Sequence, residues 1–149
     1  EFAISAVLNF DKYSNFADDL PYLGGGEIFL VNAMGGISRL TFLATQYPNN
    51  YFSFLSWSPT EEYVAFDLQN ITQPNFGLSI LNISTGEIVN YCIQDNWDYI
   101  YWSPDGKQIA FTRGNGFESY KSAYILDLEK NLAFKIADDA TVAGWVTNQ

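Results

Sequence analysis

The sequence contains no histidine and only one cysteine, Cys92, among its 149 residues. A Ser-His-Asp triad, a Cys-His dyad and the usual His/Cys zinc sites are therefore impossible within this chain. A single cysteine also excludes an internal disulfide framework. No apolar run approaches the roughly 20 residues that a transmembrane helix needs, so insertion into a membrane is not expected.

Basic residues are also scarce, with seven Lys and Arg against 17 Asp and Glu and a formal net charge of −10. Because a phosphate backbone is bound by clustered Lys and Arg, this balance excludes nucleic acid as a partner. A basic protein or peptide, a cation or a neutral ligand fits the charge better. In contrast, apolar residues make up 48% of the chain, which is enough for the core of one domain over residues 1–149.

A near-repeat of ten residues dominates what is present. Residues 57–66 (Trp-Ser-Pro-Thr-Glu-Glu-Tyr-Val-Ala-Phe) closely match residues 102–111 (Trp-Ser-Pro-Asp-Gly-Lys-Gln-Ile-Ala-Phe), 45 positions later. A third tryptophan, Trp145, follows after a further 43 positions. A period of this length predicts an array of similar units, since one such unit cannot bury its apolar face alone.

The local patterns between these tryptophans predict strands rather than helices. The expected strands are residues 27–31, 37–42, 51–57, 63–66, 78–83, 87–93, 99–102, 107–112, 123–128, 132–136 and 141–146. The opening apolar run, residues 2–8, also fits a helix, and its type stays open at this point. No other segment has a sustained helical period, so the predicted fold class is all-β.

The order of these motifs resembles the WD-like repeat of TolB-type β-propellers. It is also similar to propeller domains of prolyl oligopeptidase and dipeptidyl-peptidase relatives. Residues 102–111 match that repeat closely, and residues 57–66 match it with Thr-Glu in place of Asp-Gly. Residues 28–41 carry the third and fourth strands, and the likeness covers residues 27–147. It implies a fold more than a function, because propellers perform many unrelated tasks.

The family scheme labels the strands of a blade a to d from the innermost, Trp-bearing strand outwards. On that scheme the chain is ordered b-c-d, a-b-c-d, a-b-c-d, a. The repeats span approximately 1–43, 51–93 and 97–137, with a closing strand at 141–147. Propellers typically close with about 4–8 blades, so three blades do not make a ring.

Two explanations of the incomplete ring stay open. In the first, a second copy completes a six-bladed ring, and residues 142–146 of each chain complete the first blade of the other in a two-fold symmetric homodimer. In the second, the chain is a piece of a longer propeller.

The most conspicuous residues of the repeat are interpreted as structural. The tryptophans are expected to lie between neighbouring blades, and the Pro and Asp-Gly positions suit the turn between strands a and b. These structural residues are Trp57, Pro59, Trp102, Pro104, Asp105, Gly106 and Trp145. The Thr60-Glu61 pair is expected to need a different turn from Asp105-Gly106.

Acidic and aromatic residues are predicted to gather in the connections on one face of the blades. Such loops suit recognition, with aromatic side chains as anchors and charge for steering. The candidate partner-binding residues are Asp18, Asp19, Tyr22, Asp67, Asp95, Asp98, Glu118, Tyr120, Asp138 and Asp139. No catalytic, cofactor or metal site is predicted, because the acidic pairs lack catalytic spacing and no calcium-loop pattern is present.

The leading functional hypothesis is a non-catalytic propeller that binds a protein or peptide through this acidic loop face and needs no cofactor. A second hypothesis is an accessory propeller of a serine peptidase of the prolyl oligopeptidase type, whose hydrolase domain would be encoded elsewhere. A third is a propeller that binds a carbohydrate or another small molecule. The resemblance to TolB-type propellers implies an extracytoplasmic, periplasmic or secreted location.

Overall fold

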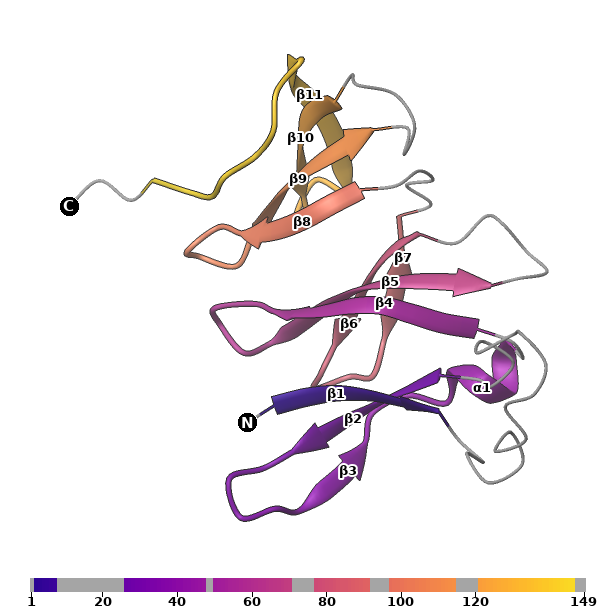
Figure 1. Ribbon diagram of the computed structural model, residues 1–149. Helices are drawn as coiled ribbons and strands as arrows, with labels where there is room; N and C mark the ends of the chain where they lie inside the picture. Colours follow the sequence, from indigo (N-terminus) through magenta and orange to yellow (C-terminus); the bar gives the residue numbers. More distant parts are fainter. Residues whose placement is uncertain are drawn as a thin grey trace. The chain divides into compact units, whose positions relative to one another are not determined.

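The computed structural model describes residues 2–7, 26–47, 50–70, 77–91, 97–114 and 121–146. These residues form eleven strands and one short helix, α1 (Leu43–Gln46) (Figure 1). The strands are β1 (Phe2–Val7), β2 (Gly26–Val31), β3 (Ile37–Arg39), β4 (Asn50–Trp57), β5 (Tyr63–Asn70), β6 (Leu78–Asn82), β7 (Ile88–Asn90), β8 (Trp97–Trp102), β9 (Gln108–Gly114), β10 (Lys121–Asp127) and β11 (Leu132–Asp138).

The strands make three antiparallel sheets in which each strand lies beside its neighbour in sequence. Blade 1 is the three-stranded sheet β1-β2-β3, blade 2 is β4-β5-β6-β7, and blade 3 is β8-β9-β10-β11. This matches the predicted order b-c-d, a-b-c-d, a-b-c-d, a in every strand but the last, so the all-β propeller prediction is confirmed. The ambiguous opening segment is a strand, because β1 pairs with β2 from Phe2 opposite Val31 to Val7 opposite Gly26.

The turn between strands c and d follows one rule in all three blades. Each begins with an Asn or Asp whose side-chain oxygen accepts hydrogen bonds from the following backbone amides. Asn32 Oδ1 accepts from Gly36 N at 2.8 Å, and Asp127 Oδ1 accepts from Lys130 N at 3.0 Å. The positive-φ residues of these turns are Gly35, Gly86 and Asn131, at 81°, 73° and 52°. Gly and Asn tolerate this conformation best, so the turns are encoded locally.

The turn between strands a and b is the same in blades 2 and 3, and the expectation of two different turns is wrong. Glu61 N donates to Ser58 O at 3.0 Å, and Gly106 N donates to Ser103 O at 2.9 Å. The residue with positive φ is Glu61 in one turn, at 58°, and Gly106 in the other, at 71°. Glu61 therefore adopts a left-handed conformation that normally favours glycine.

The chain divides into two compact units, Glu1–Ser56 with Tyr63–Gln94, and Trp57–Glu62 with Asp95–Gln149. Strand b is the most deeply buried part of each complete blade. Val64, Ala65 and Phe66 are fully buried in β5, and Ile109 and Phe111 are buried in β9. Both sequences are continuous apolar runs because these central strands are covered on both faces.

Blades 1 and 2 both belong to the first unit, and two features connect them. The backbone N–H of Gly26, at the start of β2, donates to the side-chain oxygen of Asn50, at the start of β4. The helix α1 follows β3, leads to β4, and lies beside β2 (Figure 1). This connection between β3 and β4 places Leu43, which is 2% exposed, in the core of the first unit.

Candidate interaction surfaces

The structure bears on only part of the predicted acidic face. Six of the ten candidates lie outside the described residues: Asp18, Asp19, Tyr22, Asp95, Glu118 and Tyr120. Two others are not in loops, so their predicted positions are wrong. Asp98 lies within β8, which begins at Trp97 because Trp97 pairs with Arg113. Asp67 lies within β5.

Asp67 is a buried residue rather than a loop residue. It is 6% exposed, pairs with Leu78 in the β5–β6 ladder, and accepts a hydrogen bond from the side chain of Gln69. The strand β5 continues to Asn70, beyond the predicted end at Phe66, and includes the buried Leu68. Burial of Leu68 favours this extension, and it carries Asp67 into the sheet.

Asp138 and Asp139 lie at the end of β11 and are exposed. Asp138 accepts hydrogen bonds from Lys135 Nζ at 2.7 Å and from Ser122 Oγ at 3.2 Å. The Lys135 ammonium and the Ser122 hydroxyl lower the pKa of the Asp138 carboxyl below its ordinary value. Asp138 pairs with Ser122 in the ladder, so both aspartates lie at the end of blade 3 from which the β9–β10 connection leaves.

Most of the seven Lys and Arg residues form ion pairs with Asp or Glu. The four ion pairs of the described residues are Arg39–Glu27 at 2.6 Å, Lys107–Glu129 at 2.5 Å, Lys130–Asp127 at 2.6 Å and Lys135–Asp138 at 2.7 Å. These pairs contain four of the seven basic residues. Because each pair joins one positive and one negative group, the net charge of −10 is carried by the remaining residues.

A buried carboxylate that the sequence analysis missed lies in blade 1. Glu27 is fully buried in β2. Its Oε1 accepts from Arg39 Nη2 at 2.6 Å and Ala44 N at 2.8 Å. Its Oε2 accepts from Thr41 Oγ1 at 2.6 Å and Leu43 N at 3.1 Å. Both oxygens accept hydrogen bonds from residues between β3 and the start of α1 or from Arg39 of β3, so Glu27 fixes this connection to β2.

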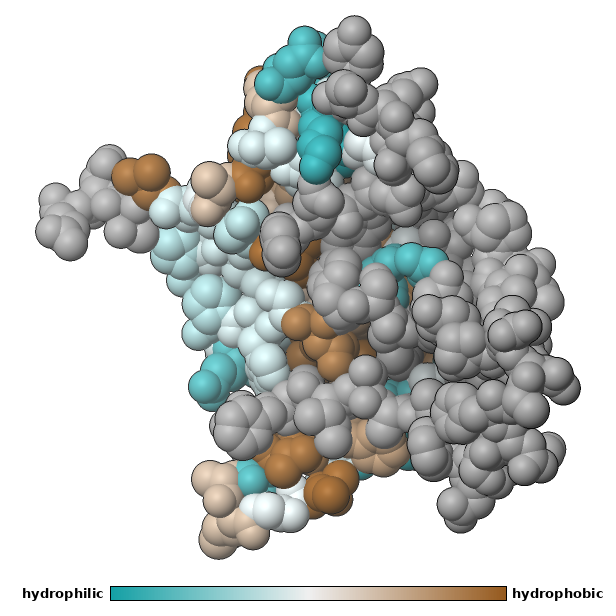
Figure 2. Space-filling model, viewed as in Figure 1, coloured by the Kyte–Doolittle hydropathy of each residue, from teal (hydrophilic) through white to brown (hydrophobic). Residues whose placement is uncertain are grey.

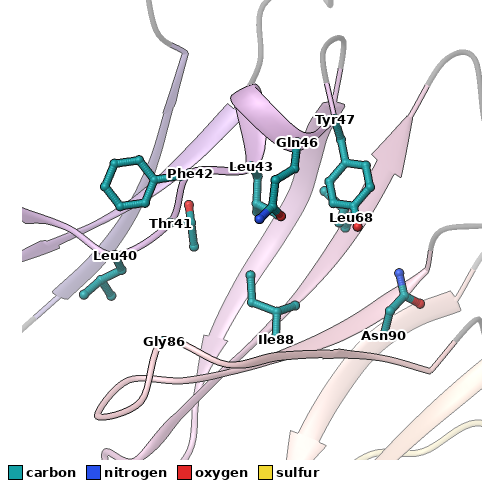
Figure 3. A pocket seen from close by; sticks show the side chains of 10 residues that line it. All are labelled: Leu40, Thr41, Phe42, Leu43, Gln46, Tyr47, Leu68, Gly86, Ile88 and Asn90. Carbon is teal, nitrogen blue, oxygen red and sulfur yellow. The ribbon is translucent and has the colours of Figure 1, made fainter.

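A hollow of about 330 Å³ lies between α1 and the outer strand of blade 2 (Figure 3). Leu43 and Leu68 form part of its apolar lining, and Ile88 points toward them from β7. Gln46 and Asn90 add amide groups at its edge. The volume is at the lower end of the range for small-ligand pockets.

Apolar side chains are exposed on the two blades at the ends of the blade order. In blade 1, Ile37 of β3 is 66% exposed, and hydrophobic surface is visible over β2 and β3 (Figure 2). In blade 3, Leu132 and Phe134 of β11 are 54% and 41% exposed. Phe134 pairs with Ile125, which pairs with Ala110, so these three lie on one face of the sheet.

The segment 141–146 follows blade 3 and carries the third repeat tryptophan. Val142 N donates to Thr112 Oγ1 at 2.8 Å, and Trp145 Nε1 donates to Tyr101 O at 2.8 Å. The predicted closing strand over residues 141–147 is wrong for residues 141–146, which are not in a strand because no described strand pairs with them. These two hydrogen bonds hold the segment against β8 and β9 of blade 3, but it belongs to none of the three sheets.

Two buried side-chain nitrogens lack a hydrogen-bond partner among the described residues, Asn50 Nδ2 and Trp57 Nε1. They lie at the first and last residues of β4. A buried donor without an acceptor costs about 1–3 kcal/mol, so such groups in a folded protein need an explanation.

Within the described part of the chain, no cluster of three or more potential metal ligands is present. No helix there has the length and apolar character needed to cross a bilayer.

These sheets define a β-propeller fold, and solved structures of TolB-like propellers share it. The putative TolB from Agrobacterium tumefaciens is 20% identical with a TM-score of 0.59, over 91% of this chain and 42% of that one. TolB from Acinetobacter baumannii is 16% identical with a TM-score of 0.56, over 75% and 26%. A prolyl endopeptidase is 13% identical with a TM-score of 0.55, over 73% and 19%.

The chain is thus similar in fold to TolB-like propellers and spans 19% to 42% of the length of these three structures. No protein-family model matches the sequence, and no curated protein matches it either. Likeness at this level of identity concerns the fold, so function has to be argued from the residues.

Proposed function

We propose that the chain is a non-catalytic propeller module that binds a basic protein or peptide through the connections at one end of its blades. The observation that carries this proposal is the acidic excess that remains after ion pairing, since four of the seven basic residues are already in ion pairs. An acidic surface of this kind accelerates the association of a cationic partner and contributes to its specificity.

The strand register gives, within each blade, the end from which the connection between strands b and c leaves. In blade 3, Gly114 pairs with Lys121 and Ser122 pairs with Asp138. The end of β11 and the 115–120 connection therefore leave the sheet at the same edge. In blade 1, Val7 pairs with Gly26, so the 8–25 connection leaves from the matching edge. The acids that belong to these two connections or to the end of β11 are Asp18, Asp19, Glu118, Asp138 and Asp139.

A charge-neutralisation experiment tests this surface. The loop variant replaces Asp18, Asp19 and Asp139 by Asn and Glu118 by Gln. The control variant replaces four acids near the opposite ends of the strands by Gln: Glu61, Glu62, Glu87 and Glu129. Both variants lose the same charge, and a panel of Lys- and Arg-rich ten-residue peptides serves as the probe.

Peptide binding to the loop variant is expected to weaken by about tenfold and to lose much of its salt dependence. The control variant is expected to keep most of the affinity. Equal losses of affinity in both variants would show that binding depends only on the net charge of the protein. Unchanged affinity in the loop variant would eliminate this surface as the binding site. An extracytoplasmic location belongs to the same proposal, and fractionation of the native host tests it.

A second candidate is an accessory propeller domain of a serine peptidase. The fold shared with a prolyl endopeptidase supports it. The chain has no histidine, so the catalytic residues of such a peptidase would belong to another domain. An α/β-hydrolase domain encoded next to this chain would support that candidate, and hydrolase activity of the combined protein would test it.

A further inference from the structure

We propose that residues 142–146 of one copy form the inner strand of blade 1 in a second copy, and that the carbonyl of Gly144 accepts the hydrogen bond of the second copy's Trp57 indole. This goes beyond the proposed function, because it concerns how the ring is assembled and not what the ring binds. It involves none of the acidic connections tested above.

The register of the incoming strand follows from an alanine that recurs in strand b of every blade. Ala65 pairs with Ile80, Ala110 pairs with Ile125, and Ala3 pairs with Leu30. The inner-strand partner of Ala110 is Tyr101, the residue before Trp102. By the same register, Ala3 would face the residue before the tryptophan of its own inner strand.

In the segment 142–146, the residue before the tryptophan is Gly144. Blade 3 pairs Trp102 with Ile109 and Ile100 with Phe111. The matching pairs in the complemented blade are therefore Trp145 with Phe2, and Ala143 with Ile4.

The unpartnered indole of Trp57 independently points to the same strand. Trp145 Nε1 donates to Tyr101 O, the carbonyl of the residue that precedes Trp102 in the inner strand of blade 3. If every repeat tryptophan bonds in this way to the inner strand of the blade before it, the indole of Trp57 requires a carbonyl from an inner strand of blade 1. That carbonyl would belong to the residue before the tryptophan of that strand. That strand is missing from the described sheet β1-β2-β3, and Trp57 Nε1 is buried without a partner. In the complemented blade, Gly144 of the second copy provides this carbonyl.

The exposed apolar faces identify the occupant as another blade. Thr112 and Ala110 are two residues apart in β9, so Thr112, which accepts the hydrogen bond from Val142, lies on the same face as Phe134. The segment 142–146 therefore leaves blade 3 across the face whose outer part exposes Leu132 and Phe134. A blade completed by this segment would cover that apolar surface and continue the blade-to-blade contact that already joins blades 1 and 2.

A second copy meets these requirements with symmetry. Each chain has one blade without an inner strand and one segment, 142–146, without a strand partner, so a two-fold axis pairs each segment with the first blade of the other copy. Two copies of three blades give six, which is within the range of about 4–8 in closed propellers. A single chain of three blades does not reach that range.

The solution mass of the 149-residue chain is the first test. Light scattering is expected to give twice the chain mass of 16.8 kDa. A variant truncated after Thr141 is expected to be monomeric and to bind a synthetic peptide of residues 140–149. The same peptide with Trp145→Ala is expected to bind at least tenfold more weakly. A monomeric full-length chain, or a dimer that survives the truncation, would overturn the proposal.

A disulfide test examines the register directly in a Cys92→Ser background. One copy carries Ile4→Cys and the other carries Ala143→Cys, and the two are mixed and oxidised. The two residues are expected to pair directly, at a separation that suits a disulfide, so a covalent dimer should form on a non-reducing gel. The control replaces Ile4→Cys by Ser5→Cys, because successive residues of a strand alternate between its two faces. Equal yields, or no crosslink with Ile4→Cys, would contradict this register.

Removal of the indole N–H tests the hydrogen bond itself. Trp57→Phe is expected to weaken dimerisation of the full chain by roughly fivefold or more. In the chain truncated after Thr141 the same change removes an unpartnered buried donor, so the loss of N–H is expected to carry no penalty there. Equal destabilisation of both forms would show that Trp57 acts only through packing within one chain and would refute the assigned hydrogen bond.

Discussion

The a–b turns of blades 2 and 3 follow the same path with different residues. The turn hydrogen bond runs from Glu61 N to Ser58 O in one and from Gly106 N to Ser103 O in the other. The positive-φ position is occupied by Glu61 in blade 2 and by Gly106 in blade 3. A non-glycine residue pays roughly 1–2 kcal/mol for this conformation, so blade 2 makes the turn in spite of its residue and blade 3 because of it.

The side chains inside the two turns also differ. In blade 3, Asp105 Oδ1 accepts from Ser103 Oγ at 2.6 Å and from Lys107 N at 3.1 Å. In blade 2, the hydroxyl groups of Ser58 and Thr60 share one hydrogen bond at 3.1 Å. Charge-assisted hydrogen bonds are stronger than neutral ones, so the blade 3 turn is stabilised further by its own side chains. The comparison shows that the flanking strands impose the turn and that local residues set only its stability.

The largest effect is expected for Gly106→Ala. The new methyl group would lie 2.9 Å from Thr60 Cγ2, on a backbone with φ of +71°. Strain and contact together are expected to lower the free energy of unfolding by about 2–3 kcal/mol, measured by urea denaturation.

Gly86→Ala is the matched control, because Gly86 has φ of +73° and no atom within 4 Å of an added methyl group. Its loss is expected to reflect backbone strain alone and to be smaller. Equal losses at the two glycines would show that the contact with Thr60 has no cost.

Glu61→Gly is expected to stabilise the protein by about 0.5–1 kcal/mol. The substitution relieves the left-handed strain, and the greater freedom of glycine in the unfolded chain offsets part of the gain. A rise in the urea midpoint measures the effect. Glu62→Gly provides the control, since Glu62 does not have a positive φ. Stabilisation by Glu62→Gly and not by Glu61→Gly would contradict the assignment of strain.

Asp105→Asn is expected to have a smaller effect that depends on pH. The hydrogen bonds from Ser103 and from the Lys107 amide lower the pKa of the Asp105 carboxyl below its ordinary value of 3.8. A depressed pKa in the folded state stabilises the protein above pH 3.8, and this contribution is lost as the pH falls through the folded-state pKa. The difference in unfolding free energy between wild type and variant should therefore shrink between pH 6 and pH 3. A constant difference would rule out this linkage.

Lys107→Ala is expected to have the smallest effect. Lys107 pairs with Glu129 at 2.5 Å, but the two side chains are 56% and 66% exposed. Water and salt screen such pairs, so any loss in the urea midpoint is expected to disappear in 1 M NaCl. Blade 2 has Glu62 at the matching position. A large, salt-independent loss would mean that Lys107 stabilises the hairpin through its packing.

The predicted strands before residue 141 and their order agree with the structure because the repeat, the alternation and the turn residues are local signals, whereas residues 141–146 lack a neighbouring strand and do not form one. The predicted positions of Asp67 and Asp98 do not agree, because each depends on where a strand ends. Neighbouring strands set those ends, through the ladder pair of Trp97 with Arg113 and the burial of Leu68. Glu27 was missed for a related reason, since its four donors come from residues 12 to 17 positions away.

The sequence by itself determined the class of fold and the order of strands in the three sheets. It did so because strand period, turn chemistry and the tryptophan repeat act over short distances. Only the tertiary structure decided that Glu61 takes a left-handed turn, that Glu27 is buried among its donors, and that the indole of Trp57 lacks an acceptor. Those outcomes depend on which distant groups meet in three dimensions, and no local pattern encodes that.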